Sequence, residues 1–329
     1  MFYKFFGLSK NPFEVDPDPN FLYLSPQHRE ALSHLTYSVI ARKPYLLLTG
    51  DIGVGKTTLL NYFIRNIKKK QDIFLVPIYN PNLTIADFYH LLSDQVKIGI
   101  NVPKPKFLIE FSNKLLKLAT EGKALVIVID EAQAASEELL EELRLLSNAT
   151  YGSNSLIMIL VGQPDLLQKL SSPKLSSLRQ RFSYRYHLGP FQDEYEVSQY
   201  LITRILRSGS PKTRIFNNEA IAEIFHLSRG VPRVINILAE HAMINAYLRK
   251  ETVVGREDVK MAAKEVEHVF VSPKKSFQTN FEISEVNSRK KSYSSWFLTL
   301  FLIFFLILTI YFLVNPEKIS DFWRLFWGK

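Results

Sequence analysis

The first 190 or so residues alternate short apolar runs with longer stretches that are apolar on one side only. Six consecutive apolar residues, as at 124–129, are typical of a strand covered on both faces. Strands that alternate with helices of this length predict an α/β fold, with a parallel sheet between two helical layers. The expected strands are 45–48, 73–78, 124–129 and 156–161, and the expected helices are 28–40, 56–67, 85–97, 107–120 and 137–148.

Beyond Pro190 the pattern becomes entirely helical. Asn217-Asn218 and Gly255-Arg256-Glu257-Asp258 are capping signals for helices that begin just after them. Residues 191–268 therefore predict a separate helical domain, with helices at about 194–208, 218–227, 232–249 and 256–267.

The C-terminal part differs from both. Residues 269–294 are polar and without periodicity, which is typical of a flexible linker. Residues 296–314 carry no charge, glycine or proline, and about 18 such residues suffice to cross a bilayer. The sequence thus predicts an α/β domain at 1–190, a helical domain at 191–268, a linker at 269–294, a transmembrane helix at 295–314 and a short tail at 315–329.

The amino-acid composition excludes the types of site that depend on cysteine. The 329 residues include no cysteine, which excludes disulfides, thiolate metal sites and thiol catalysis. The formal net charge of +9 is compatible with nucleic acid, anionic lipid or an acidic partner, and equally with simple solubility.

A glycine-rich motif joins the first strand to the helix that follows. Gly50, Gly55, Lys56 and Thr57 stand at the spacing G-x-x-x-x-G-K-T, whose backbone N–H groups wrap around phosphate. The positive end of the helix dipole points to the same phosphates. Lys56 is expected to reach the β- and γ-phosphates of ATP, and the Thr57 hydroxyl to bind Mg²⁺. The predicted nucleotide-binding residues are Gly50, Asp51, Ile52, Gly53, Val54, Gly55, Lys56, Thr57 and Thr58.

Two carboxylates follow the strand at 124–129. Ligands of open α/β sheets bind at the carboxyl ends of the strands, where Asp130 and Glu131 stand. With a phosphate-binding motif about 75 residues upstream, Asp130 is the candidate Mg²⁺ partner. Glu131 is the candidate base that deprotonates the attacking water.

Two single residues and one arginine-rich run have two interpretations each. Gln163, at the tip of the strand 156–161, would sense the γ-phosphate or bond to its own backbone. Arg179, Arg181 and Arg185 alternate with other residues, so the run 178–186 would form a charged strand face, or its arginines would reach a neighbouring subunit's γ-phosphate. Arg233 begins a helix, where a cation is unfavourable; this indicates an external anion, unless the side chain is simply solvated.

Residues 3–268 resemble the AAA+ ATPases of the general secretion pathway protein A group and related pilus-biogenesis ATPases. By this resemblance Lys56 and Thr57 belong to Walker A, and Asp130 and Glu131 to Walker B. Gln163 is then sensor 1, Arg233 is sensor 2, and Arg181, or else Arg179, is the arginine finger. The matching passages are Phe6-Gly7-Leu8, Asn11-Pro12-Phe13, Pro17-Asp18-Pro19, Leu22-Tyr23-Leu24-Ser25, His28-Arg29-Glu30-Ala31-Leu32, Asn80-Pro81-Asn82-Leu83-Thr84, Asp130-Glu131-Ala132-Gln133, Leu143-Arg144-Leu145-Leu146-Ser147-Asn148, Leu160-Val161-Gly162-Gln163-Pro164, Gln180-Arg181 and Tyr186-His187-Leu188-Gly189-Pro190.

The resemblance implies an ATP- and Mg²⁺-dependent ATPase that works as a homo-oligomer. Members are anchored in the cytoplasmic membrane by one helix, with the ATPase domain in the cytoplasm. We therefore expect an envelope assembly protein of a secretion, pilus or polysaccharide-export machine as partner, a bilayer around 295–314 and an external tail. Several members continue into a periplasmic peptidoglycan-binding domain. This sequence departs from that pattern, because the residues after Val314 are too few to fold.

Two other functions compete with this one. The same branch resembles DNA-associated ATPases of origin recognition and transposition, and the chain is basic. Salt-dependent binding of DNA would favour that function. The other alternative is a scaffold that binds nucleotide without hydrolysing it, against which Glu131 argues.

Overall fold

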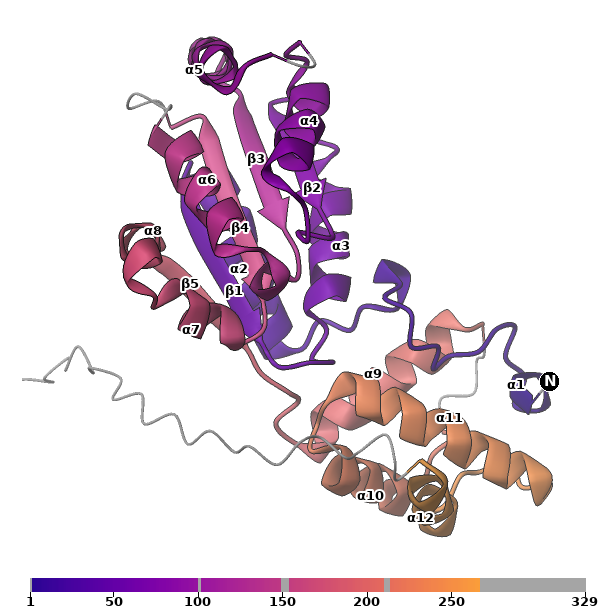
Figure 1. The fold of residues 1–329 in the computed structure, drawn as a ribbon. Helices are drawn as coiled ribbons and strands as arrows, with labels where there is room; N and C mark the ends of the chain where they lie inside the picture. Colours follow the sequence, from indigo (N-terminus) through magenta and orange to yellow (C-terminus); the bar gives the residue numbers. More distant parts are fainter. Residues whose placement is uncertain (1, 100–101, 149–153, 210–213, 267–329) are drawn as a thin grey trace, which may run out of the picture. The chain divides into compact units, whose positions relative to one another are not determined.

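The computed structural model describes residues 2–99, 102–148, 154–209 and 214–266, all within one compact unit, Met1–Ser272 (Figure 1). The predicted linker 269–294, transmembrane helix 295–314 and tail 315–329 lie outside the described residues. Within the described ranges, no helix has both the length and the apolar character needed to cross a membrane.

A parallel sheet forms the centre of the α/β domain, as predicted, and among the described residues it contains a fifth strand, β5, beside the four expected ones. Its strands are β1 (Tyr45–Gly50), β2 (Ile73–Ile78), β3 (Ala124–Ile129), β4 (Leu156–Gly162) and β5 (Tyr184–Leu188). Their spatial order is β2-β3-β4-β1-β5, and every neighbouring pair is parallel. All carboxyl ends therefore meet at one edge, where the loops after β1, β3 and β4 lie together.

Alternate residues of β1, β2, β3 and β4 enter two different cores. Val126 and Val128 pack with α2 (Pro26–Ile40) and α3 (Lys56–Ile67). Ile127 and Ile129 pack on the other face, under α4 (Ile85–Val96), α5 (Lys104–Thr120) and α6 (Glu137–Asn148). All six residues of β3 are buried, which is why this run shows no polar alternation in the sequence.

The arginine-rich run does not form one strand. Ser176–Arg181 is a short helix, α8, and β5 begins only at Tyr184. Leu175, Leu178 and Phe182 are spaced as on one face of a helix, and all three are buried in the same core. Burial of this face favours a helix, although the arginines alternate as they would in a strand. Four further short elements were not predicted from the sequence: α7 (Asp165–Leu170) and the 3₁₀ turns η1 (Pro19–Phe21), η2 (Ala132–Ala134) and η3 (Pro173–Leu175).

The described part of the helical domain contains α9 (Glu194–Arg207), α10 (Asn218–Ser228), α11 (Pro232–Leu248) and α12 (Arg256–Glu265). Asp193 and Asn217 cap the first two through their side chains, because each accepts a hydrogen bond from a backbone N–H in the first turn. Phe6, Leu8 and Phe13, which follow α1 (Phe2–Phe5), pack into the core of this domain. The N-terminal segment thus belongs to the helical domain in packing, although it precedes the α/β domain in sequence.

Candidate functional site

The phosphate loop, residues 50–57, leads from β1 into α3 through Gly55, whose φ of +100° is accessible chiefly to glycine. Lys56 opens the helix and is only 5% exposed. Its Nζ donates to the backbone oxygens of Gly50 at 2.7 Å and Asp51 at 2.9 Å. Burial lowers the pKa of Lys56, and the nearby acidic groups oppose this effect. The ammonium group therefore lies folded over the loop, within reach of any phosphate bound there.

Thr57 and Asp130 meet across the sheet edge, although β4 separates their strands. Thr57 Oγ1 donates to Asp130 Oδ2 at 2.9 Å, and the Glu131 N–H donates to Asp130 Oδ1 at 2.9 Å. Asp130 is 2% exposed, and burial raises its pKa against the effect of these hydrogen bonds. A hydroxyl and a carboxylate suit Mg²⁺, which prefers oxygen ligands and is commonly held by one or two protein groups together with phosphate. Among the described residues, no group of three or more His, Cys, Asp or Glu side chains is placed so that it could hold a metal ion.

Glu131 has a left-handed backbone, with φ of +49°, which is uncommon outside glycine and recurs at functional sites. Its Oε2 accepts a hydrogen bond from Gln163 Nε2 at 3.4 Å and another from Gln133 Nε2. The structure thus brings together the predicted base and the predicted sensor at the tip of β4. Gln133, which the sequence analysis did not select, joins them.

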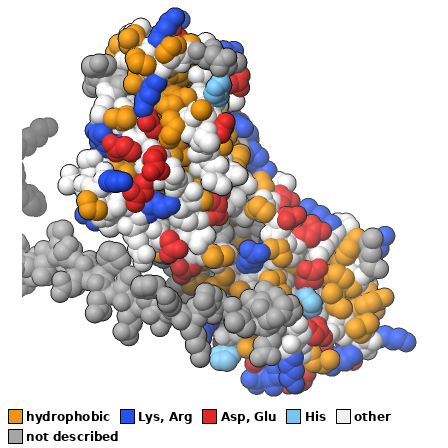
Figure 2. All heavy atoms as spheres, viewed as in Figure 1, with side chains coloured by type: hydrophobic (Ala, Val, Ile, Leu, Met, Phe, Trp, Pro, Cys, Tyr) orange, Lys and Arg blue, Asp and Glu red, His pale blue; other side chains and the backbone are white. Residues whose placement is uncertain are grey.

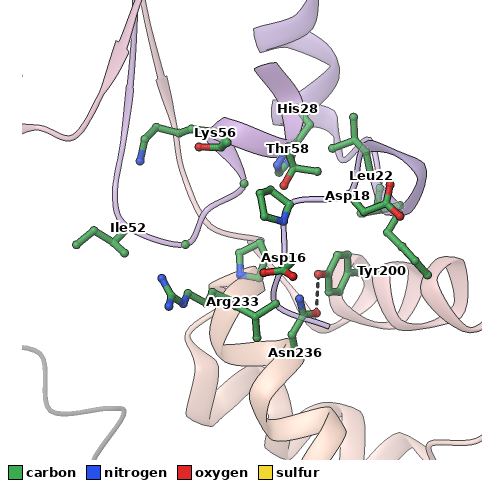
Figure 3. A pocket seen from close by; sticks show the side chains of 18 of the residues that line it. Asp16, Asp18, Leu22, His28, Ile52, Lys56, Thr58, Tyr200, Arg233 and Asn236 are labelled. Carbon is green, nitrogen blue, oxygen red and sulfur yellow. Dashed lines mark hydrogen bonds between the residues drawn. The ribbon is translucent and has the colours of Figure 1, made fainter. Parts of the chain in front are cut away.

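A cavity of about 230 Å³ opens beside these groups. Its wall includes the phosphate loop, Glu131 and Gln163 on one side, and the segment around Val15–Tyr23 with parts of the helical domain on the other. Figure 3 shows Tyr200 and Asn236 on the helical-domain side, joined by a hydrogen bond of 2.7 Å. The cavity therefore has a polar end at the phosphate loop and a second wall that includes aromatic and apolar side chains.

Arg233 lies in the first turn of α11, as predicted, and its side chain lines the cavity near the phosphate loop (Figure 3). Its backbone N–H donates to the Gly53 carbonyl at 3.1 Å. The helical domain is thereby joined directly to the phosphate loop.

His28 is a site residue that sequence reasoning did not select. It is 3% exposed and its Nε2 lies 3.1 Å from the Val54 carbonyl, while Nδ1 lies 2.7 Å from Ser25 Oγ. A carbonyl only accepts, so Nε2 carries the proton and Nδ1 accepts from the hydroxyl. Burial lowers the pKa of His28 to about 4. The capping pattern at Ser25-Pro26 places His28 in the first turn of α2, but nothing in the sequence indicates its contact with the phosphate loop.

The predicted arginine fingers lie away from this cavity. Arg181 donates to the Tyr45 hydroxyl at 3.0 Å, to Asn148 Oδ1 at 2.6 Å and to Ser147 Oγ. Tyr45 begins β1, whereas the phosphate loop follows its end, so Arg181 lies at the opposite edge of the sheet. Arg179 is exposed and donates to Ser171 Oγ at 3.2 Å. Either arginine would act only on a nucleotide held by another subunit.

Comparison with known proteins agrees with this geometry. Residues 40–170, which contain the phosphate loop, β3 and its carboxylates, match an AAA domain family. The chain is 36% identical over 269 residues to general secretion pathway protein A of Aeromonas hydrophila. This chain is similar to general secretion pathway protein A and contains a match to an AAA domain. The match covers 81% of the chain but only 48% of that relative, so the chain spans about half the relative's length.

Replication proteins are also similar. The chain is 27% identical over 247 residues to a putative ORC1-type DNA replication protein 1 of Thermoplasma acidophilum, a match that covers 72% of the chain and 67% of the relative. Among solved structures, Cdc6p from Pyrobaculum aerophilum superposes with a TM-score of 0.59 at 17% identity, covering 77% of this chain and 74% of that one. The ORC2 protein of Aeropyrum pernix gives a TM-score of 0.58 at 17% identity, covering 78% and 72%. At these identities the solved structures establish the fold alone.

Proposed function

We propose that this chain is an AAA-type ATPase that binds ATP with Mg²⁺ in the cavity beside the phosphate loop and hydrolyses it there. The observation that carries this proposal is the hydrogen bond between Thr57 and Asp130, with Lys56 and Glu131 on either side of it. Mg²⁺ would supply positive charge that neutralises the bound phosphates. Thr57 would bind the metal directly, and Asp130 would hold it directly or through water.

In the hydrolysis step, a water oxygen forms a bond to the γ-phosphorus. The bond from that phosphorus to the bridging oxygen breaks, and its electron pair leaves with ADP. Glu131 takes a proton from the water, and inorganic phosphate is released. Lys56 and the backbone N–H groups of the loop stabilise charge on the β- and γ-oxygens. Gln163 lies beside Glu131, which suits a residue that senses the γ-phosphate.

The same site suggests how hydrolysis moves the helical domain. Arg233 lines the cavity and its backbone is bonded to Gly53 of the phosphate loop. When the γ-phosphate is lost, the anion that would attract Arg233 is lost with it. A finger from Arg181 or Arg179 would require a neighbouring subunit, so we propose that the active form is a homo-oligomer.

We further propose that the ATPase serves an envelope assembly machine at the cytoplasmic membrane. The similarity to general secretion pathway protein A supports this role. The apolar run at 295–314 would anchor the chain, with the ATPase domain in the cytoplasm. Hydrolysis would then act on an envelope partner of the secretion, pilus or polysaccharide-export type.

A DNA-associated function is the second candidate, favoured by the similarity to an ORC1-type replication protein. Proteins of this kind bind DNA through concentrated basic surface. On the face shown in Figure 2, acidic and basic side chains occur together on the α/β domain, and Lys and Arg side chains gather at the lower end of the helical domain.

Turnover by the full chain in lipid nanodiscs, measured over a range of protein concentrations with and without duplex DNA, separates the two candidates. Turnover that rises steeply with protein concentration, requires Glu131 and ignores DNA supports the proposed function. Turnover that appears only with DNA would replace it with the second candidate. Nucleotide binding without turnover under every condition would indicate a scaffold.

A further inference from the structure

The side chain of Gln133 occupies a position between the predicted base and the tip of β4. Its Nε2 donates to Glu131 Oε2, and its Oε1 accepts the Gln163 backbone N–H at 3.0 Å. An amide has one donor end and one acceptor end, and here each end has a partner of the matching kind. Glutamate would lack the donor, and a hydrocarbon side chain would lack both groups.

The backbone around Gln133 is shaped for this contact. A Cβ on Gly162 would lie 2.7 Å from Gln133 Oε1, so the amide in its present position uses space that a side chain at residue 162 would occupy. Lys169 of α7 donates to the carbonyl oxygens of Gln133 and Ala135, at 2.5 and 2.6 Å. The turn that follows Glu131 is thus bound to β4 and to the helix after it at several points.

The hydrogen bonds from Gln133 and Gln163 involve only one of the two oxygens of the Glu131 carboxylate. Oε2 accepts both amide donors, whereas none of the described residues donates to Oε1. A carboxylate held at one oxygen has a fixed orientation and presents the other oxygen to the cavity that Glu131 lines. Small displacements of a catalytic group reduce rates strongly, so a contact that fixes its orientation affects the rate more than the binding of substrate.

We propose that Gln133 is a positioning residue for ATP hydrolysis: it orients the Glu131 carboxylate toward the attacking water and couples it to the tip of β4 at Gly162 and Gln163. This inference rests on the proposed function, in which Glu131 is the base. When Gln163 responds to the γ-phosphate, its backbone N–H moves with it, and Gln133 transmits that movement to Glu131.

Steady-state turnover and equilibrium binding of a fluorescent ATP analogue test this role in the full chain. Gln133→Leu keeps much of the volume and removes both polar ends. We expect kcat to fall about 10- to 100-fold, with nucleotide affinity within about threefold of wild type. Gln168→Leu, the same change at an exposed position of α7, is the matched control and should change neither quantity. Equal losses of affinity and kcat in Gln133→Leu, or turnover that is unchanged or higher, would overturn the positioning role.

A double-mutant cycle with Gly162 tests whether Gln133 is coupled to the tip of β4. Gly162→Ala alone should lower kcat about tenfold, because its Cβ displaces the Gln133 amide. In a Gln133→Ala background the contact with the amide is gone and only Leu166 Cδ2, at 3.1 Å, remains close to the added Cβ, so Gly162→Ala should change kcat less than about twofold. Additive effects would show that Gly162 acts independently of Gln133 and would overturn the coupling. Failure of the inference is distinguishable from failure of the proposed function, because the latter requires that wild type does not hydrolyse ATP or that Glu131→Gln hydrolyses it normally.

Discussion

The Arg233 N–H donates to the Gly53 carbonyl at 3.1 Å, and the Arg233 Cβ occupies the space beside that glycine. A Cβ built on Gly53 would lie 2.7 Å from the Arg233 Cβ, and the φ of Gly53 is +83°. The phosphate loop and the helical domain are therefore fitted to each other at a point that only glycine allows.

Gly53→Ala should separate these two elements. The Cβ must displace either the phosphate loop or the start of α11, so we expect nucleotide affinity and turnover to fall by about tenfold or more. Gly122→Ala is the control, since Gly122 also has a positive φ, of +68°, but a Cβ there meets nothing within 4 Å. Both variants carry a backbone cost of about 1 kcal/mol. Equal nucleotide affinity in the two variants would show that the contact with Arg233 has no role in binding.

Lys56 and Glu131 should fail in different ways. Lys56→Ala removes the cation that lies over the loop, so equilibrium binding of ATP should weaken by about tenfold or more. Glu131→Gln keeps the shape of the side chain but cannot take a proton. It should bind ATP with nearly wild-type affinity and lose about 100-fold or more in kcat. Wild-type turnover in Glu131→Gln would remove Glu131 from the role of base.

The buried His28 should make the protein sensitive to acid. Its pKa is about 4 in the folded protein and about 6.5 in the unfolded chain, so the unfolded state binds more protons between these values. Stability is therefore unaffected above about pH 6.5 and falls as the pH drops toward 4, by up to about 3 kcal/mol. We expect the difference in urea unfolding between pH 7.5 and pH 5 to shrink in His28→Gln. His90→Gln, at an exposed position of α4, should retain the full difference. An unchanged difference in His28→Gln would refute this assignment.

The two arginines of α8 can be tested as fingers by mixing variants. Arg181→Ala subunits keep Glu131, and Glu131→Gln subunits keep Arg181. If the finger acts between subunits, each preparation should be inactive alone, and a mixture should recover turnover at the interfaces where both groups are intact. Mixtures of Arg179→Ala with Glu131→Gln test the other arginine in the same way.

A structural role for Arg181 predicts a different pattern. Arg181 donates to the Tyr45 hydroxyl and to Asn148, so its loss would then lower the free energy of unfolding by about 1–3 kcal/mol. Tyr45→Phe would reproduce part of that loss, and mixing would restore nothing. That result would leave Arg179 as the remaining candidate.

The sheet and the phosphate loop were predictable from the sequence because local chemistry determines them. The run 124–129 is apolar throughout since both faces of β3 are covered, and Asp130 follows it at the strand end where ligands bind. Gly55, Lys56 and Thr57 are constrained by their own neighbours in the chain. The helices 137–148 and 232–248 follow from apolar periodicity of the same local kind.

The other site residues depend on contacts that no local pattern records. His28 reaches Val54 only because α2 packs against the α/β core, and Phe13 enters the helical domain from the far end of the sequence. Around Ser176–Arg181 the arginines alternate as in a strand, whereas the apolar residues are spaced as in a helix. The burial of Leu178 and Phe182 stabilises the helix. Gln133 belongs to the motif Asp130-Glu131-Ala132-Gln133, but its role depends on contacts with Glu131 and with Gln163 at the tip of β4, which only the fold brings together.

The contact between Thr57 and Asp130 predicts how the enzyme depends on Mg²⁺. Thr57→Ser keeps the hydroxyl that donates to Asp130 Oδ2, whereas Thr57→Val keeps the shape and removes the hydroxyl. We expect Thr57→Ser to retain turnover within a fewfold of wild type. Thr57→Val should lose about 100-fold in turnover at low Mg²⁺ and recover part of it at high Mg²⁺, since one of the metal's oxygen ligands is gone. A titration of turnover against Mg²⁺, after removal of divalent cations with EDTA, measures both. If Thr57→Val had the wild-type Mg²⁺ dependence, the hydroxyl would serve only to position Asp130, and the metal would need other ligands.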